Sequence, residues 1–454
     1  MNTYSSYKDS GIEWIGEIPS GWRIEKLKYI GNLYGGLTGK SGKDFNNEDN
    51  PYNKPFIPFT NIFNNVYISS NHFQYVNIKP DERQNRVIKN DLFFLMSSEG
   101  YEDLGKSSIL ISEIDELYLN SFCKGYRVNT DDVNPLFVNY QLLGNTHRKL
   151  ISIEGKGFTR INLRQDKLKN TYMFIPPLQE QQQIVDYLDK KTSKIDTLIK
   201  KTEQKIELLK EQRISLISTT VTKGLNSNVE MKDSGVEWIG EIPSGWSLSK
   251  IKYLPNEEKN SFTDGDWIES KDLSDSGIRY ITSGNIGSGN YKEQGSGYIT
   301  EETFNKLKCT ELFPGDLVMS RLFLPVGRSC ILPNLNNRVI TAVDNVILRP
   351  KECYSNFFLN FFFNSFYYSE HSKLISRGVT LTRISRGMLG NVHVVVPPLQ
   401  EQQQIVDYLD KETSRIDKLV DIESKRIVLL KEYRQSLISE VVTGKVDVRD
   451  EVLV

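Results

Sequence analysis

Residues 100–107, GYEDLGKS, have the GxxxxGK[ST] spacing of a phosphate-binding loop. In such a loop, backbone amides cradle the phosphates of a nucleotide and the lysine reaches the terminal ones. Glu102 and Asp103 would, however, place carboxylates beside those phosphates. The residues from Ser107 onward, SSILIS, are typical of a strand, whereas a phosphate-binding loop opens a helix. The corresponding residues 322–329 in the second half of the chain lack the first glycine and the lysine. We therefore predict a turn that presents a basic residue.

No other pattern predicts catalysis or metal binding. The chain has no HExxH, no GxSxG and no Asn/Asp-Pro-Pro-Tyr/Phe motif that would bind S-adenosylmethionine for amino-group methylation. The four cysteines form no CxxC pair and have no histidines clustered beside them, so we expect neither a zinc site nor disulfides, but reduced thiols. They are Cys123, Cys309, Cys330 and Cys353. We predict that this chain is not an enzyme and binds no metal or cofactor itself.

Length and charge limit the possible classes of protein. A chain of 454 residues has room for two to four domains. Its 57 Lys and Arg nearly balance 58 Asp and Glu, so any affinity for nucleic acid must come from local patches. The N-terminus has no basic region followed by an apolar core, and no run of about 18 apolar residues occurs. We expect a cytoplasmic protein without a membrane partner.

Polar and cationic residues gather in the turns that the two halves of the chain share. Arg and Lys suit guanine edges and phosphates, Asn and Gln suit adenine, and Ser and Thr suit either. Each such residue alone is more often a solvated turn residue or a helix cap, but together they predict a DNA-binding surface. The predicted DNA-binding residues are Thr60, Asn61, Ser97, Ser98, Lys106, Arg160 and Asn162 in the first half, and Thr282, Ser283, Asn285, Ser320, Arg321, Arg328, Thr380, Thr382 and Arg383 in the second.

Two segments of the chain are repeated almost unchanged. Residues 8–22, KDSGIEWIGEIPSGW, recur at residues 232–246 with one Ile-to-Val difference. Residues 176–190, PPLQEQQQIVDYLDK, recur without change at residues 397–411. The chain therefore consists of two copies of one unit, in which near-identical borders enclose a divergent insert.

The two inserts, insert 1 (residues 23–175) and insert 2 (residues 247–396), have nearly equal lengths and little identity. Short β-rich runs such as residues 91–96, broken by Gly, Asn and Pro, predict strands. Residues 134–149 and 355–373 have a helical pattern. Each insert is therefore predicted to be a mixed α/β, or α+β, domain.

After each Pro-Pro pair the pattern becomes helical, over residues 180–223 and 401–445. Steps of four and three from Ile195 give a heptad seam, and the same seam recurs 221 residues later. Each helix could lie on its own domain, but pairing of the two helices explains more, because seams this long need a partner. Arg213 and Arg434 interrupt the seams at equivalent positions and are candidates to fix the register.

Each helix would be about 65 Å long at 1.5 Å per residue. If the two helices pair antiparallel, a pseudo-two-fold axis relates the repeats and the helices form a rigid spacer between the inserts. The predicted division is a first recognition domain at residues 1–175, a helix at 176–224, a second recognition domain at 225–396, and a helix with its tail at 397–454.

This combination resembles the specificity subunit of type I restriction-modification systems over essentially the whole chain. The resemblance is carried by Gly21-Trp22 and Gly245-Trp246 near the start of each unit, by Pro-Pro-Leu-Gln-Glu-Gln with Ile-Val-x-x-Leu leading each long helix, and by the duplication. It implies two target-recognition domains joined by two long helices in an antiparallel coiled coil. Each domain would bind one half of a split, asymmetric target in the major groove of double-stranded DNA.

The resemblance also implies partner subunits. Two methylation subunits would dock on the helices and domains and transfer a methyl group from S-adenosylmethionine to adenine N6. Restriction subunits would add DNA translocation and cleavage with ATP and Mg²⁺. Two alternatives stay open: a P-loop ATPase that depends on Lys106, and a coiled-coil scaffold whose inserts contact other proteins.

Overall fold

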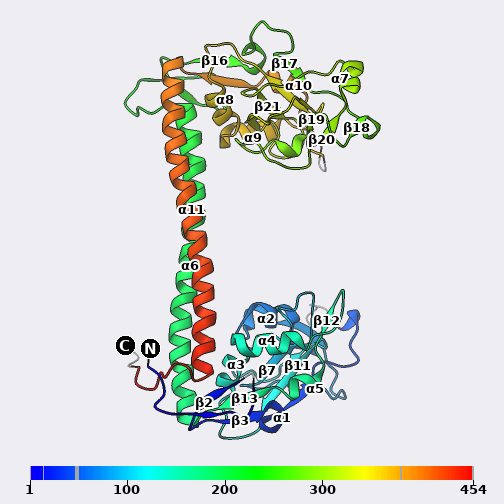
Figure 1. Ribbon diagram of the computed structural model, residues 1–454, viewed down its shortest axis with the longest axis vertical. Helices are drawn as coiled ribbons and strands as arrows, with labels where there is room; N and C mark the ends of the chain where they lie inside the picture. The colour runs from blue at the N-terminus through cyan, green and yellow to red at the C-terminus, as the bar shows by residue number, and fades with distance from the viewer. Residues whose placement is uncertain (1, 14, 46–50, 379–380, 452–454) are drawn as a thin grey trace. The chain divides into compact units, whose positions relative to one another are not determined.

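The computed structural model describes residues 2–13, 15–45, 51–378 and 381–451 (Figure 1). They form two compact units: unit 1 comprises Met1–Thr202 and Lys425–Val454, and unit 2 comprises Glu203–Ser424. Each unit contains one insert, and the long helices α6 (Leu178–Lys223) and α11 (Leu399–Val442) contribute residues to both units. The predicted division into four consecutive segments stays a prediction.

Unit 1 is centred on an antiparallel four-stranded sheet with the order β4-β11-β7-β9. A three-stranded sheet, β10-β5-β6, and the pairs β1-β2, β3-β13 and β8-β12 complete its β-structure. The strands are β1 (Tyr7–Asp9), β2 (Glu17–Pro19), β3 (Arg23–Lys26), β4 (Gly31–Gly35), β5 (Asn53–Ile57), β6 (Gln74–Asn77), β7 (Leu92–Leu95), β8 (Ser97–Ser98), β9 (Ser107–Ile109), β10 (Tyr118–Leu119), β11 (Cys123–Val128), β12 (Ile161–Asn162) and β13 (Tyr172–Ile175). The short helices are α1 (Leu27–Ile30), α2 (Phe59–Asn64), α3 (Pro135–Leu143), α4 (Asn145–Ile153) and α5 (Gln165–Lys169), with 3-10 turns η1 (Gly42–Asp44) and η2 (Ser70–His72).

Unit 2 repeats the central sheet as β17-β24-β21-β22, beside a second four-stranded sheet, β18-β20-β19-β23. Its strands are β14 (Met231–Asp233), β15 (Glu241–Pro243), β16 (Ser247–Lys250), β17 (Phe262–Asp264), β18 (Leu273–Ser274), β19 (Ile278–Ile281), β20 (Gly297–Ile299), β21 (Leu317–Ser320), β22 (Ser329–Ile331), β23 (Val339–Thr341), β24 (Asn345–Leu348) and β25 (His393–Val396). Its short helices are α7 (Glu301–Leu307), α8 (Asn356–Phe363), α9 (Phe366–Leu374) and α10 (Arg386–Gly390), with 3-10 turns η3 (Ile251–Tyr253), η4 (Ser270–Asp272) and η5 (Ser283–Asn285).

Strand β7 shows why these sheets lie at the centre of the inserts. Its sequence, LFFL, is buried on both faces: Leu92 and Phe94 belong to one hydrophobic cluster, and Phe93 belongs to another. Successive side chains of a strand point to opposite faces, so a continuous apolar run needs a core on each side. β21 repeats the arrangement, with its first two residues in different clusters. The predicted mixed α/β fold is confirmed.

The helical pattern predicted over residues 134–149 and 355–373 is divided into two helices in each insert. Gly144 has an extended backbone between α3 and α4, and a Cβ there would lie 3.2 Å from Val442 Cγ2 of α11. In unit 2 the break falls at Asn364, whose amide nitrogen donates to the Asn360 carbonyl at 2.7 Å and to the Ser329 carbonyl at 3.1 Å. Close approach of a neighbouring helix and a side chain that bonds to the backbone thus end α3 and α8.

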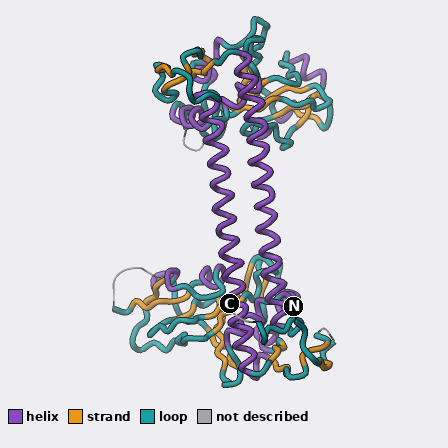
Figure 2. Tube along the Cα trace, turned by 90° about the vertical axis from the view of Figure 1, so that its left-hand side faces the viewer, coloured by secondary structure: helices purple, strands orange, loops and turns teal. Residues whose placement is uncertain are grey.

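Within each unit α6 and α11 lie side by side (Figures 1 and 2). In unit 1, Ile184 and Leu188 near the start of α6 pack with Leu437 and Val441 near the end of α11. In unit 2 the end of α6 packs with the start of α11, so the helices run antiparallel in both units. The predicted pairing is confirmed.

Equivalent ion pairs join the helices in the two units. Arg213 Nε lies 2.9 Å from Asp417 Oδ1 in unit 2, and Arg434 Nε lies 2.8 Å from Asp196 Oδ1 in unit 1. The repeat offset of 221 residues maps one pair onto the other. The two arginines that interrupt the seams therefore contact the opposite helix at matching positions.

Candidate nucleic-acid interface

Partly buried ion pairs join strands of the central sheets to neighbouring residues and recur in both units. Arg127 makes a bidentate contact with Asp91, with Nε 2.8 Å from Oδ1 and Nη2 2.7 Å from Oδ2. Arg349 makes the same contact with Asp316 at 2.9 and 2.7 Å, and this hydrogen bonding raises the pKa of Arg349. Such charge-assisted, two-point contacts hold the strands firmly, so the turns that follow them have a fixed position.

In unit 1 a short β-bridge ends at strand β12, which pairs with β8. Lys156 and Asn162 exchange two backbone hydrogen bonds, of 3.1 and 2.9 Å. Gly157 closes the turn with φ of +145°, and a Cβ there would lie 2.0 Å from the Arg160 carbonyl oxygen, so only glycine fits. Strand β12 at the end of this turn pairs with β8. We call residues 96–98 and 156–164 edge 1.

Unit 2 has the same arrangement 221 residues later. Arg377 and Arg383 exchange backbone hydrogen bonds of 2.9 and 2.8 Å, and Gly378 has φ of +97°. The backbone nitrogen of Phe323 donates to the Thr382 carbonyl at 2.9 Å, which joins this bridge to the segment after β21. We call residues 320–324, 377–378 and 381–386 edge 2.

The two edges bring together eight of the sequence-predicted residues from separate parts of the chain. In edge 1, Asn162 is paired with Ser97, and Ser98 is paired with Ile161 next to Arg160. Arg160, Asn162 and Arg383 are exposed. The residues brought together are Ser97, Ser98, Arg160 and Asn162 in edge 1, and Ser320, Arg321, Thr382 and Arg383 in edge 2.

Several predicted residues are buried inside the fold, which corrects their assignment to the surface. Asn61 is 1% exposed and donates to the Ser69 carbonyl at 2.8 Å, and Asn285 is 0% exposed and donates to the Lys292 carbonyl at 2.9 Å. A buried side chain of this kind cannot reach a base without leaving its partner unsatisfied, which is costly. The predicted residues that are buried and hydrogen-bonded within their unit are Asn61, Ser98, Ser283, Asn285, Ser320 and Arg321.

Arg328 is half-buried and holds the loop of edge 2 instead of facing outward. Its guanidinium donates to the carbonyls of Leu322 at 3.1 Å, Phe323 at 3.0 Å and Ser283 at 2.8 Å. Burial lowers the pKa of Arg328, and the backbone carbonyls occupy its donors. Its predicted contact with DNA is therefore replaced by a positioning role.

The remaining predicted residues lie outside this grouping or outside the described residues. Thr60 is exposed in the first turn of α2, and Thr282 caps η5 by accepting from Gly284 N. Lys106 is half-buried, with Nζ 4.6 Å from the centre of the Phe63 ring and 3.8 Å from Asp103 Oδ1. Thr380 lies outside the described residues.

The segment with the spacing of a phosphate-binding loop leads into strand β9 instead of a helix. Burial lowers the pKa of Lys106, and its ammonium group faces an aromatic ring and a carboxylate. Without a helix N-terminus behind it, the turn lacks the dipole that binds phosphate. The predicted turn is present, but its lysine is half-buried and packs against Phe63, so the turn does not present it freely to solvent.

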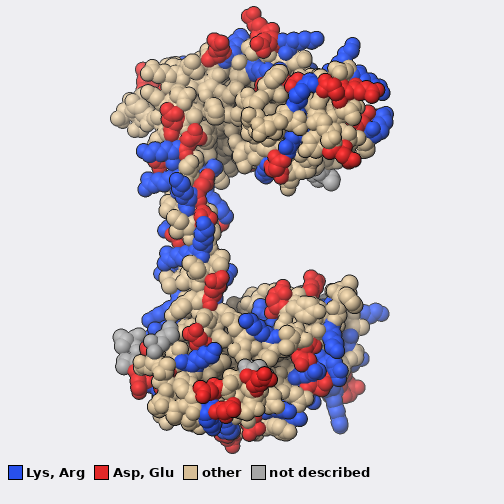
Figure 3. All heavy atoms as spheres, in the orientation of Figure 1, with Lys and Arg blue, Asp and Glu red and all other residues tan. Residues whose placement is uncertain are grey.

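Sequence reasoning missed four cations at the edges. Lys156 and Arg377 occupy equivalent bridge positions and are exposed, as are Arg164 and Arg386. The repeat offset could have revealed the first pair, because both members are basic. Figure 3 shows Lys and Arg side chains gathered over the part of unit 1 that holds β12 and α5. Each edge thus gathers exposed cations, of which Arg164, Arg383 and Arg386 are paired with carboxylates.

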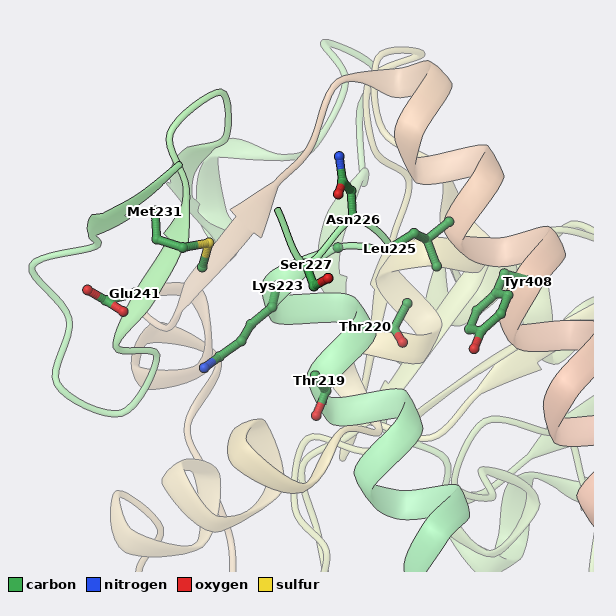
Figure 4. Close-up of a pocket in the computed structure, with 10 residues that line it drawn as sticks. Thr219, Thr220, Lys223, Leu225, Asn226, Ser227, Met231, Glu241 and Tyr408 are labelled. Atoms are coloured by element: carbon green, nitrogen blue, oxygen red, sulfur yellow. The ribbon is translucent and has the colours of Figure 1, made fainter. Parts of the chain in front are cut away.

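The cavity drawn in Figure 4, of about 520 Å³, lies in unit 2 at the end of α6. Thr219, Thr220 and Lys223 of α6, the segment that follows this helix, and Tyr408 of α11 line it. None of the sequence-predicted site residues that the structure describes lines it. Among the described residues, no group of three or more His, Cys, Asp or Glu side chains could hold a metal ion, and no helix is long and apolar enough to cross a membrane.

Comparison with known proteins gives consistent relatives. The chain is 23% identical over 380 residues to the type I restriction enzyme MjaVIII specificity subunit of Methanocaldococcus jannaschii, covering 82% of this chain and 83% of that protein. Its fold matches that of the HsdS subunit from Thermoanaerobacter tengcongensis with a TM-score of 0.58 and 16% identity, over 94% of this chain and 98% of the other. A chain solved in a study of complex assembly and conformational transition of the type I R-M system matches with a TM-score of 0.71 and 16% identity, over 94% and 99%.

The family model described as the type I restriction modification DNA specificity domain matches twice, at residues 19–208 and 244–432. Each match covers the last residues of the border before an insert, the insert itself and much of the following long helix. Because the two matches span most of the chain, this protein belongs to the type I restriction-modification DNA specificity family.

Proposed function

We propose that this chain is the non-catalytic DNA-specificity subunit of a type I restriction-modification complex, and that it binds an asymmetric bipartite target. Insert 1 binds one half-site and insert 2 binds the other, each in the major groove. The arrangement of edges 1 and 2 carries the proposal, because one backbone frame presents two different sets of exposed side chains.

The difference between the edges supports two different half-sites. Edge 1 presents Arg160 and Asn162, which suit guanine and adenine edges. Edge 2 presents Arg377 and Arg383 in the same bridge. Asn162 and Arg383 occupy equivalent positions, so the two inserts would read different bases there.

Catalysis would belong to partner subunits. Two methylation subunits would dock on the paired helices and the inserts, bind S-adenosylmethionine and methylate adenine N6 in the target. Restriction subunits would use ATP and Mg²⁺ for translocation and cleavage. The loop with Lys106 supports this division of labour, since it lacks the helix that a nucleotide site needs.

The pair formed by α6 and α11 would set the distance between the half-sites. The matching contacts of Arg213 and Arg434 support this role, because they define one register in both repeats. Lengthening both helices by one heptad should widen the gap between half-sites and leave their sequences unchanged.

Methylome sequencing tests the proposal in cells that express this chain with its methylation subunit. The expected result is one bipartite motif with a methylated adenine in each half-site. Replacement of insert 1 by the insert of a relative should change one half-site only, with insert 2 as the internal control. Loss of the bipartite pattern in the parent chain, or a change in both half-sites after the exchange, would contradict the proposal.

A further inference from the structure

The tip of edge 1 presents a large apolar side chain directly to solvent. Phe158, next to Gly157 in the tight turn, is 103% exposed. A single exposed apolar residue needs no explanation. This one stands on a turn whose backbone is fixed by the bridge between Lys156 and Asn162 and by the pairing of β12 with β8. The position of its backbone is therefore defined, although no residue that the structure describes in unit 1 covers its ring.

Edge 2 presents apolar side chains at its tip as well. Leu381 is 57% exposed, Phe323 is 50% exposed and Leu324 is 53% exposed. Leu381 lies on the Arg377–Arg383 bridge, and Phe323 is bonded to Thr382 on that bridge. The residue equivalent to Phe158 is Val379, which lies outside the described residues, so the exposed apolar side chains of the two edges share a bridge and not an equivalent position. Apolar exposure beside the same bridge in two inserts of little identity points to a shared use.

The Phe323 loop is held in an uncommon conformation. Phe323 has φ of +59°, which bulky residues rarely adopt. The guanidinium of Arg328 donates to its carbonyl at 3.0 Å and to that of Leu322 at 3.1 Å, which holds the loop in place. A half-buried cation thus holds the loop that presents two exposed apolar side chains.

Exposed cations lie in both edges. Lys156, Arg160 and Arg164 are exposed in edge 1, where Arg164 also makes a two-point contact with Asp166. Arg377, Arg383 and Arg386 are exposed in edge 2, where Arg383 is 2.8 Å from Asp344 and Arg386 is 3.4 Å from Asp264. An apolar centre with a cationic rim matches a DNA groove, in which phosphates line the borders and bases form the floor.

We propose that these exposed apolar side chains contact thymine: Phe158 in unit 1, and Leu381 with Phe323 in unit 2, pack on the C5-methyl groups of thymines in the major groove of their half-sites. Thymine is the base that offers an apolar group there, and phenylalanine is one of the side chains that contact it. The proposal rests on the DNA-specificity function and adds which bases the exposed apolar residues select.

The test uses the full chain assembled with its methylation subunits and a duplex that carries both half-sites. Each thymine of half-site 1 is replaced in turn by uracil, which differs only by the missing methyl group. One replacement should weaken binding about 4-fold, the effect of burying one methyl-sized group. Phe158→Ala should weaken binding to the normal duplex by roughly 4- to 10-fold and abolish the effect of that uracil.

Two matched controls accompany this variant. Phe122→Ala removes another exposed ring of unit 1, 68% exposed and outside edge 1, and should leave binding unchanged. In Leu381→Ala, a uracil replacement in half-site 2 should no longer weaken binding, whereas the effect of uracil in half-site 1 should be unchanged. Because Phe158 is fully exposed, its removal should not change the thermal unfolding of the complex.

The outcomes separate this proposal from the function on which it rests. A wild-type complex that prefers no unique sequence overturns both. If the wild-type complex binds its bipartite target and Phe158→Ala binds it equally well, only the proposed thymine contact is overturned. A weakened Phe158→Ala complex in which no uracil position loses its effect also overturns the methyl contact, and would indicate insertion of the ring between base pairs instead.

Discussion

The junction between insert and long helix is closed in unit 1 and open in unit 2. In unit 1 the hydroxyls of Tyr67 and Tyr140 both donate to Asp189 Oδ1 of α6, at 2.5 Å for Tyr140. In unit 2 the residues equivalent to Tyr140 and Asp189 are Phe361 and Asp410, and they line a groove of about 680 Å³. The same place in the repeat thus holds a hydrogen-bonded cluster in one unit and open space in the other.

This difference shows how a repeated border acquires its role from a divergent insert. Asp189 and Asp410 belong to a 15-residue segment that is identical in both repeats. Asp189 has two tyrosine partners because insert 1 supplies them, and burial followed by this bonding raises the pKa of Tyr140 to about 12. Asp410 has no such tyrosine pair, since Phe361 stands where Tyr140 stands in unit 1. Its partial burial, and to a smaller extent the nearby Asp407, raises the pKa of Asp410.

A second pair of identical residues shows the same contrast. Tyr187 of α6 is 5% exposed, because it packs in a cluster with Val446 and Val448 after α11. The equivalent Tyr408 of α11 is 39% exposed and lines the cavity at the end of α6. Tyr187 is covered by the segment after α11, whereas Tyr408 lies beside a cavity that the segment after α6 lines. The segments outside the helices therefore decide whether this tyrosine is covered.

Substitution of Asp189 or Asp410 should give the largest difference in stability between the two units. Asp189→Ala leaves two tyrosine hydroxyls without their charged acceptor and should destabilise unit 1 by about 3 kcal/mol. Asp410→Ala removes no hydrogen bond of this kind and should change unit 2 by less than about 0.5 kcal/mol. Hydrogen exchange of peptides from α3 and α8 measures the two effects. Equal losses of protection in both units would refute the contrast.

A buried histidine should make unit 1 more sensitive to acid. His147 is 0% exposed, with Nε2 2.9 Å from the Tyr172 carbonyl, and burial lowers its pKa to about 4. The unfolded chain binds a proton near pH 6.5, so stability is fully present above that pH and falls until about pH 4. Unit 1 should lose about 2 kcal/mol from this group by pH 5.

The equivalent residue in unit 2 is Tyr368, which is also buried and does not gain a proton in this range. Urea unfolding of the two units at pH 7 and pH 5, read by pulsed hydrogen exchange, compares them in one chain. His147→Gln is the control, since it should remove the extra acid sensitivity of unit 1. The same pH dependence in the variant and the parent would show that other groups cause it.

The open junction of unit 2 should be closable by one atom. Phe361→Tyr would give α8 the hydroxyl that Tyr140 has, within the groove that Asp410 lines. A hydrogen bond to this carboxylate should stabilise unit 2 by about 1 kcal/mol. The gain should vanish in the double variant Phe361→Tyr, Asp410→Ala, and a gain that persists there would mean that the added hydroxyl acts without the aspartate.

Much of the fold could be predicted because its signals are periodic. The duplicated borders, the heptad seams and the strand-like inserts each recur, so two copies support one interpretation. The break at Gly144 was missed, because it depends on the approach of α11, which is distant in sequence.

The candidate interface was less predictable because turn residues serve two purposes. Asn61 and Asn285 are residue types that suit adenine, but here they bond to the backbone of their own turns. The sequence cannot distinguish these uses, since both need a polar side chain in a turn. Two tertiary contacts build edge 1: the bridge between Lys156 and Asn162, and the pairing of β12 with β8. Because neither is visible in the sequence, the cations beside them were not recognised as one group.

The smallest expected effect concerns the interhelical ion pairs, which test whether the helices differ as the junctions do. Arg213 and Asp417 have side chains 37% and 56% exposed, whereas Arg434 is 19% exposed beside Asp196. Exposed pairs contribute little, so Arg213→Ala should cost less than about 0.5 kcal/mol and Arg434→Ala up to about 1 kcal/mol. Added salt should reduce the effect of Arg213→Ala more, because its pair is the more accessible to ions. Equal costs and equal salt dependence in urea unfolding would mean that the difference between the units ends at the inserts and does not extend into the paired helices.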